Sequence, residues 1–277
     1  MDFFNSSATL AAATPFLIAL SVGLGAWWVG RRRRRRFLGE AALILGAYAV
    51  YFAVRSITEG SISVARENAR LLIDLERQVG LLVEPSVQQV LLSSDVLVDV
   101  ANWIYVWGHW PVIGVVAIWL FNKRPSAYRT YRNALLISGA IGLVMFVSFP
   151  LAPPRFTTEL GLVDTVFGGE TLGRLLQPTQ LTNEYAAFPS LHFGWSLLMA
   201  TAIYREAQRQ PLRVVAWLLP AGMLVAIIAT ANHFVLDAVA GGAVAMIGLR
   251  AALMLDRRGL PEAVTSRLPG HTRPDAA

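Results

Sequence analysis

Long apolar runs separated by short polar segments dominate the sequence, and this pattern predicts a helical protein that crosses a membrane several times. A helix needs about 20 largely apolar residues to span the hydrocarbon core of a bilayer. Seven segments fit this description: 10–30, 37–55, 97–121, 132–150, 189–204, 213–231 and 233–254. The expected fold class is therefore all-α, a polytopic transmembrane helix bundle.

The two longest connections between these segments carry different patterns. Segment 56–96 contains apolar residues at helical spacing with charged residues between them, which predicts an amphipathic helix at the interface. Its apolar series is Ala65, Ala69, Leu72, Leu75, Val79 and Leu82. Glu84-Pro85 predicts the start of a second short helix, because proline is favoured in a first turn. Segment 151–188 is rich in glycine and is expected to be irregular. Either connection can pack on the ends of the spans or gate a site.

The composition supports a lipid environment. Hydrophobic residues make up 55% of the chain and charged residues 15%, whereas soluble domains carry about 25% charged residues. The chain has no cysteine, which excludes disulfides, a thiol nucleophile and a thiolate metal site.

The net charge of +6 has a topological explanation rather than a nucleic-acid partner. If each segment crosses once, the basic clusters within 31–36, 123–132, 205–213 and 250–258 all lie on the same side. The positive-inside rule then places the N-terminus outside and the C-terminus in the cytoplasm, as for a protein of the plasma (inner) membrane.

Two histidines mark the outer ends of two spans, and ionisable residues within spans usually indicate function. His192 lies at the start of segment 189–204, and His233 opens segment 233–254. Asp237 follows His233 at i+4, which places both on one helix face. A carboxylate there fixes the imidazole tautomer and leaves Nε2 ready to attack or bind. The alternative is a structural His–Asp pair that holds helices together.

A phosphorus centre suits two such histidines, one as nucleophile and the other as general acid. Arg155, Ser190 and Asn232 are the candidate phosphate ligands beside them. Arginine binds phosphate oxygens through two N–H groups, and helix N-termini add backbone N–H donors. The alternatives are a headgroup anchor for Arg155 and a helix cap for Ser190. A His/His/Asp zinc site is a weaker hypothesis, because no HExxH-like pair occurs.

A further polar set lies on segment 97–121. Asn102, Tyr105 and His109 share one face at i, i+3 and i+7, above Pro111, which can kink the helix. They form either a polar wall of the substrate cavity or an interhelical hydrogen bond. Small residues on the last segment indicate close helix packing. They are Gly241, Ala245 and Gly248.

These motifs resemble those of a known family. Phe188-Pro189-Ser190-Leu191-His192, followed by His233-Phe234-Val235-Leu236-Asp237, resembles the second and third signature motifs of the type 2 phosphatidic acid phosphatase superfamily. Together with Ala152-Pro153-Pro154-Arg155, they are similar to the inositol phosphorylceramide synthase-like branch. The resemblance implies a six-span core to which the first span is an addition. The expected segments are 1–36, an extra helix with an arginine block; 37–256, the catalytic membrane domain; and 257–277, a disordered cytoplasmic tail.

The resemblance also implies roles for individual residues. His233 maps to the nucleophile, Asp237 to its partner and His192 to the general acid, in a reaction that needs no metal or other cofactor. The expected substrate is a membrane lipid or polyprenyl-type phosphate at the extracytoplasmic face.

The sequence departs from the phosphatase pattern at two places. Ile227 stands six residues before His233, where the phosphatases have arginine. Lys123-Arg124-Pro125 falls on the cytoplasmic side, so Arg155 is left as the main cationic ligand. Both departures leave open whether water or a lipid or sugar hydroxyl accepts the phosphoryl group.

A transporter or non-catalytic lipid-binding protein is the rival class. Broken helices in matching halves of the chain, which are typical of transporters, are not evident.

Overall fold

The structure is a computed structural model that describes residues 31–57, 62–168 and 184–257. The first predicted span, 10–30, and nearly all of the predicted tail lie outside these ranges. Within them every regular element is a helix, which confirms the all-α fold class. The elements are α2 (Arg31–Ile57), α3 (Ile62–Gln78), α4 (Glu84–Leu91), α5 (Asp95–Trp107), α6 (Trp110–Lys123), α7 (Pro125–Ser148), η1 (Pro154–Phe156), η2 (Thr158–Leu160), α9 (Leu191–Glu206), α10 (Gln210–Val215), α11 (Leu218–Ala229) and α12 (Val235–Arg257).

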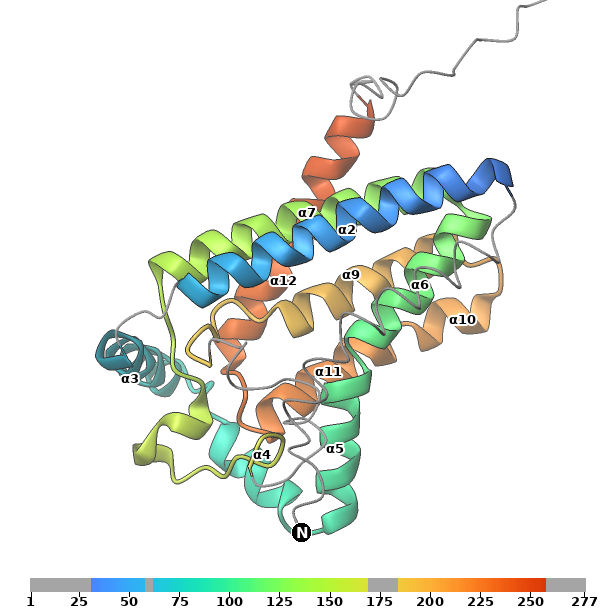
Figure 1. Cartoon of the computed structure of the whole chain (residues 1–277). Helices are drawn as coiled ribbons and strands as arrows, with labels where there is room; N and C mark the ends of the chain where they lie inside the picture. Colours follow the sequence, from blue (N-terminus) through green and yellow to red (C-terminus); the bar gives the residue numbers. More distant parts are fainter. Residues whose placement is uncertain (1–30, 58–61, 169–183, 258–277) are drawn as a thin grey trace, which may run out of the picture.

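Helix α12 is the centre of the bundle. It packs along α7 and α9, while α11 packs against α9 and α5, and α2 lies along α7 (Figure 1). Two apolar clusters hold these helices together around Leu198, Met199 and Leu249 on one side and Met223 and Ile227 on the other.

Glycines allow α12 to approach its neighbours closely. A Cβ built on Gly241 would lie 2.0 Å from the Ser190 carbonyl oxygen, and one on Gly194 would lie 2.3 Å from the Gly241 oxygen. Toward α7, a Cβ on Gly248 would meet the Ala134 carbonyl oxygen at 2.7 Å. The small-residue packing predicted from the sequence is therefore confirmed, and it fixes the start of α12 against the start of α9.

The predicted basic loops gather at one end of the bundle. Arg132 at the start of α7 pairs with Glu40 of α2 at 2.5 Å, and Arg124 pairs with Glu206 at the end of α9 at 3.8 Å. Thr130 of α7 donates a hydrogen bond to Asp256 at the end of α12. We call this the basic end. The start of α9, which carries His192, and the turn before α12, which carries His233, lie at the opposite end of the bundle.

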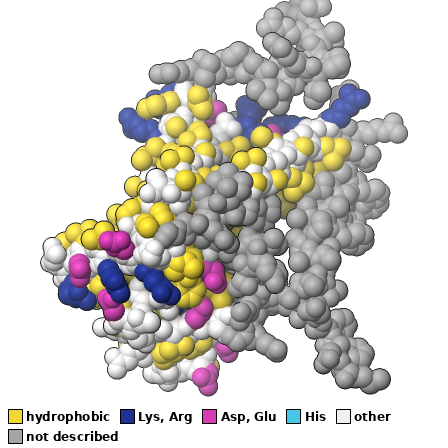
Figure 2. All heavy atoms as spheres, turned by 60° about the vertical axis from the view of Figure 1, so that its left-hand side comes forward, with side chains coloured by type: hydrophobic (Ala, Val, Ile, Leu, Met, Phe, Trp, Pro, Cys, Tyr) yellow, Lys and Arg dark blue, Asp and Glu magenta, His cyan; other side chains and the backbone are white. Residues whose placement is uncertain are grey.

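The long helices carry large hydrophobic residues on their outer surfaces. Examples on different helices are Leu43, Val115, Val144, Val225 and Val239, all exposed. Figure 2 shows hydrophobic side chains along the long helices and mixed charges on the lobe that holds α3. An apolar exterior of this extent is what lipid contact requires and what soluble proteins avoid. The chain is a membrane protein.

The predicted number of spans is only partly recovered. In the described ranges, three segments are long and apolar enough to cross a membrane: α7, Gln210–Ala229 and α12. The number rises to four if α4 and α5, bent by 119°, form one broken span. The predicted single helix over 97–121 is wrong. The chain breaks at Gly108 and His109, because Pro111 lacks the N–H that a continuous helix would use, and α6 starts afresh at Trp110.

The amphipathic helix predicted within 56–96 is present as α3, and α4 starts at Glu84 as predicted. The buried face of α3 differs from the predicted one, however. Leu75 and Val79 are exposed, whereas Ile73 and Glu76 are buried. The true face follows residues 65, 69, 72, 73 and 76, so a carboxylate occupies a position that the pattern assigns to the core.

Candidate active site

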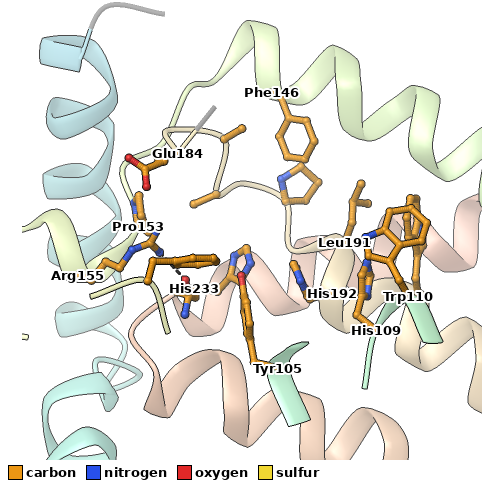
Figure 3. Close-up of a pocket in the computed structure, with 16 residues that line it drawn as sticks. Tyr105, His109, Trp110, Phe146, Pro153, Arg155, Glu184, Leu191, His192 and His233 are labelled. Carbon is orange, nitrogen blue, oxygen red and sulfur yellow. Dashed lines mark hydrogen bonds between the residues drawn. The ribbon is translucent and has the colours of Figure 1, made fainter. Parts of the chain in front are cut away.

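A cavity enclosing about 110 Å³ lies at the histidine end of the bundle. Its walls come from α5, α6, α7, α9, the start of η1 and the turn before α12, so segments far apart in the sequence meet there (Figure 3). Of the residues predicted for the site, the cavity is lined by Tyr105, His109, Arg155, His192, Asn232 and His233.

His233 and Asp237 form the predicted pair. Nδ1 of His233 lies 3.4 Å from Oδ2 of Asp237, whose side chain is fully buried. The same oxygen accepts a hydrogen bond from the Phe234 N–H at 3.0 Å, which fixes the carboxylate. Because Nδ1 faces Asp237, the other ring nitrogen, Nε2, is the one directed to the cavity. This arrangement can stabilise positive charge on the ring as Nε2 forms a bond.

The turn before α12 holds His233 in place by backbone hydrogen bonds. The N–H groups of Asn232 and His233 both donate to the Ile227 carbonyl oxygen, at 3.0 and 3.1 Å. Ala231 has a positive φ of 54°, a conformation that residues with a Cβ adopt rarely. Its carbonyl oxygen accepts a hydrogen bond from the Arg155 N–H at 3.0 Å. The nucleophile candidate and the phosphate-ligand candidate are thus fixed to the same turn.

His192 lies among aromatic rings. Its ring centroid is 5.8 Å from that of His233, 4.6 Å from Tyr105 and 4.2 Å from His109. His109 in turn stacks on Trp195 at 5.6 Å, with the two rings parallel to within 1°. Tyr105 and His109 therefore orient the His192 ring. The sequence predicts only that Tyr105 and His109 share a helix face, not that they contact His192.

Arg155 projects into the cavity from η1 and is held on every side. Its Nη1 donates to Oδ1 of Asn232, and its Nε lies 3.1 Å from Oδ2 of Asp164. The guanidinium carbon lies 4.6 Å from the centre of the Phe156 ring and 5.2 Å from that of Phe167. The guanidinium has five N–H groups, so these two polar partners leave donors for an anionic ligand in a fixed orientation.

Two predicted site residues have other roles in the structure. Ser190 is buried, and its hydroxyl caps α9 by accepting from the Phe193 N–H at 3.5 Å. Asn102 does not line the cavity. Its amide exchanges hydrogen bonds with Thr165, at 2.8 Å to the carbonyl oxygen and 3.0 Å from the hydroxyl. It thereby holds the loop that carries Asp164 and Phe167.

The cavity has chemically different ends (Figure 3). Arg155, Pro153 and Glu184 lie at one end, and Phe146, Leu191 and Trp110 at the other, with His233 and His192 between them. An amphiphilic ligand matches this gradient, because its charged group can meet Arg155 while its apolar part contacts the aromatic and aliphatic walls. No group of three or more histidine and acidic side chains in the described ranges is placed to bind a metal ion.

The family model of the PAP2 superfamily matches residues 70–251, which is more than half of the chain. The chain belongs to the PAP2 superfamily. The matched region runs from α3 into α12 and includes every cavity residue described above. No curated protein and no solved structure matches the chain. Membership of the PAP2 superfamily indicates a membrane-associated phosphatase or phosphotransferase that acts on a lipid phosphate.

The structure adds residues to this PAP2 site that the sequence pattern does not indicate. They are Asp164 and Phe167, which hold Arg155, and the cavity residues Trp110, Phe146, Glu184 and Trp195. The residues on the irregular connection have no periodic signal. Trp195 has one, since it follows His192 at i+3 and shares its helix face.

Proposed function

We propose that this protein transfers a phosphate-containing headgroup between lipid and alcohol substrates through a phosphohistidine intermediate on His233. One observation carries the proposal: His192 of α9 and His233 of the turn before α12 line one cavity with Arg155. The polar-to-apolar gradient of that cavity supports a lipid phosphate, or a polyprenyl-type phosphate, as the donor.

In the first step, Nε2 of His233 attacks phosphorus while the bond from phosphorus to the leaving oxygen breaks. His192 gives its proton to that oxygen, and Asp237 stabilises the positive charge on the His233 ring. Arg155 and Asn232, joined by a hydrogen bond, hold the phosphoryl oxygens. In the second step, the now neutral His192 takes a proton from the acceptor hydroxyl. The acceptor oxygen then forms a bond to phosphorus, and the bond to His233 breaks.

Two features distinguish the site from the phosphatase pattern. Ile227, at the position of the phosphatase arginine, is fully buried, and Lys123-Arg124-Pro125 lies at the basic end. Arg155 is consequently the cationic ligand of the cavity, as in the inositol phosphorylceramide synthase-like branch that the motifs resemble. Glu184 supplies a carboxylate that can accept hydrogen bonds from a polyol. Simple hydrolysis of a lipid phosphate or pyrophosphate uses the same steps with water.

The separation of basic end and histidine end supports a topology in which the site faces the extracytoplasmic side. Arginines at the basic end or beside it include Arg36, Arg124, Arg132, Arg205 and Arg213. The positive-inside rule assigns such an end to the cytoplasm.

The proposal is tested with the full chain in detergent or nanodiscs. A panel of lipid and polyprenyl phosphates is incubated with and without inositol or glycerol, and released phosphate and headgroup-transfer products are measured. We expect transfer products to rise and free phosphate to fall as the alcohol is added. Release of phosphate alone at every alcohol concentration would favour the hydrolase.

The mechanism is tested with His233→Ala and with His271→Ala as the control, which removes the histidine outside the described residues. We expect His233→Ala to lower kcat by at least about 10³-fold and His271→Ala to leave it unchanged. The protein should also acquire an acid-labile phosphate that His233→Ala abolishes, and chelator should not prevent it. Normal turnover in His233→Ala would rule out the proposed nucleophile.

A further inference from the structure

Two glutamates are buried beside the start of α12, away from the cavity. Glu76 lies near the end of α3 and Glu84 is the first residue of α4, and both side chains are 0% exposed. Gly80, with a φ of +71°, makes the turn between the two helices and lets them bring both carboxyl groups to one place. Burying an acidic side chain is unfavourable unless it is hydrogen-bonded or paired. The groups that bind the two glutamates therefore indicate what the glutamates do.

The partners are the first backbone N–H groups of α12. Glu84 Oε1 accepts from Val235 N at 3.1 Å, and Glu76 Oε1 accepts from Leu236 N at 2.7 Å. Asp237 Oδ2 accepts from Phe234 N at 3.0 Å. Three successive N–H groups that a helix start leaves unpaired are thus each bound by a carboxyl group. Two of these come from helices remote in the sequence.

Each glutamate uses only one carboxyl oxygen, Oε1, to bind α12. The carboxyl groups lie within hydrogen-bonding reach of one another, yet Oε2 of each finds no donor among the side chains and backbone around it. Two carboxylates in this position would repel and leave both oxygens unsatisfied. One proton converts one oxygen into a donor and satisfies both groups.

We propose that Glu76 and Glu84 are positioning residues that share one proton and together fix the first turn of α12, and with it the His233–Asp237 pair. Neither glutamate lines the cavity, so neither is a catalytic residue. The expected effect on catalysis rests on the proposed role of His233. The shared proton and its effect on the stability of the first turn of α12 do not.

The electrostatics around Glu76 agree with a retained proton. Burial, and then the negative charges of Glu84 on α4 and Asp237 on α12, raise the pKa of Glu76 to about 8, against the opposing effect of the Leu236 N–H. A raised pKa means that the folded state binds the proton more tightly than the unfolded state. The resulting stability is fully present below the ordinary value of 4.5 and is lost as the pH rises through about 8.

The experiment uses Glu76→Gln, Glu84→Gln, the double variant, and Glu67→Gln as an exposed control on α3. Each single glutamine can accept from its α12 N–H and donate to the remaining carboxylate, so it imitates the protonated partner. In the double variant two amides face each other, and one NH₂ group has no acceptor in either orientation.

We expect the thermal midpoint of wild type, followed by the fluorescence of its eight tryptophans, to fall as the pH rises from about 5 to 8 and to level off above that range. Each single variant should match wild type near pH 5 and lose most of this pH dependence. The double variant should unfold roughly 5–10 °C below the single variants at every pH. Glu67→Gln should follow wild type throughout.

Phosphoryl transfer is measured on the same samples. We expect kcat, more than KM, to fall above about pH 8 in wild type and to stay level in the single variants. A double variant as stable as the singles would overturn the shared proton, as would a single variant that keeps the wild-type pH dependence or fails to fold. The thermal midpoints require no turnover, so a wrong assignment of His233 would leave them unaffected. Failure of the shared proton and failure of the proposed function are therefore distinguishable.

Discussion

The Arg155 guanidinium donates a hydrogen bond to the amide oxygen of Asn232, the residue that directly precedes His233. This contact links the connection after α7 to the start of α12. It is accompanied by the hydrogen bond from Arg155 N to the Ala231 carbonyl oxygen at 3.0 Å. The same turn therefore positions both Arg155, which we assign to phosphate binding, and His233, which we assign to attack on phosphorus.

The first prediction concerns the shape of the Arg155 side chain. Arg155→Lys keeps the charge but loses the planar fork that contacts Asn232 and Asp164 at once. We expect kcat/KM for a lipid phosphate to fall by roughly 10²-fold, as for the loss of one oriented transition-state donor. Arg70→Lys is the matched control, because Arg70 is exposed and pairs with Glu159 away from the cavity. Equal effects of the two substitutions would contradict a phosphate-binding role for Arg155.

The second prediction separates a general acid from a merely structural His192. A general acid matters most when the leaving oxygen is strongly basic. We expect His192→Ala to lower turnover of a lipid phosphate by about 10²–10⁴-fold, and to affect an activated aryl phosphate such as p-nitrophenyl phosphate far less. Release of p-nitrophenol and of inorganic phosphate measures the two cases. If both substrates lose activity to the same extent, His192 supports the cavity but does not protonate the leaving group.

The sequence was sufficient for the parts of the site that depend on local geometry. The spacing of His233 and Asp237 predicts a pair on one helix face. The structure confirms the pair, with Nδ1 and Oδ2 3.4 Å apart, but His233 lies in the turn before α12, which begins at Val235. The alternation of apolar runs and basic loops predicts a helical membrane bundle, and the contacts at the basic end agree with it. His192 and His233 lie at one end because His192 is in the first turn of α9, His233 directly precedes α12, and these two helices pack against each other.

What the sequence could not supply depends on contacts between distant segments. Asp164 lies on an irregular connection, and only the folded chain shows that it pairs with Arg155. Asn102 has the spacing of a cavity residue, but it binds Thr165 instead. Glu76 is the exception, since it falls on the apolar face of α3 at the spacing of Ala69 and Leu72. A carboxylate in that position signals a buried partner, although not which one.

The third prediction tests how closely α12 must approach α9. A methyl group at Gly241 would lie 2.0 Å from the Ser190 carbonyl oxygen, and backbone cannot move aside cheaply. We expect Gly241→Ala to lower the unfolding free energy by about 1–3 kcal/mol and to reduce activity, since Ser190 and Asp237 also share a backbone hydrogen bond at 3.0 Å. Gly114→Ala in α6 is the control, because nothing lies within 4 Å of its Cβ position. Thermal unfolding should leave that variant unchanged or slightly more stable, and a similar loss in both would exclude the packing explanation.

The fourth prediction concerns Ala231, the residue with positive φ between α11 and His233. Its φ of 54° is left-handed, which is unfavourable for a residue with a Cβ by about 1–2 kcal/mol. Glycine removes that strain but loses about 0.5–1 kcal/mol of backbone entropy on folding. We therefore expect Ala231→Gly to leave the unfolding free energy unchanged or to raise it by up to about 1 kcal/mol.

Ala221→Gly is the matched control for this position. Ala221 is an exposed residue of α11, so the same substitution there should lower stability by about 1 kcal/mol. The opposite signs are the test, and thermal unfolding of both variants under one condition measures them. Since the Ala231 carbonyl oxygen holds the Arg155 N–H at 3.0 Å, an Ala231→Gly protein of normal stability should also keep its kcat. A loss of stability at both positions would show that the turn before His233 stores no strain.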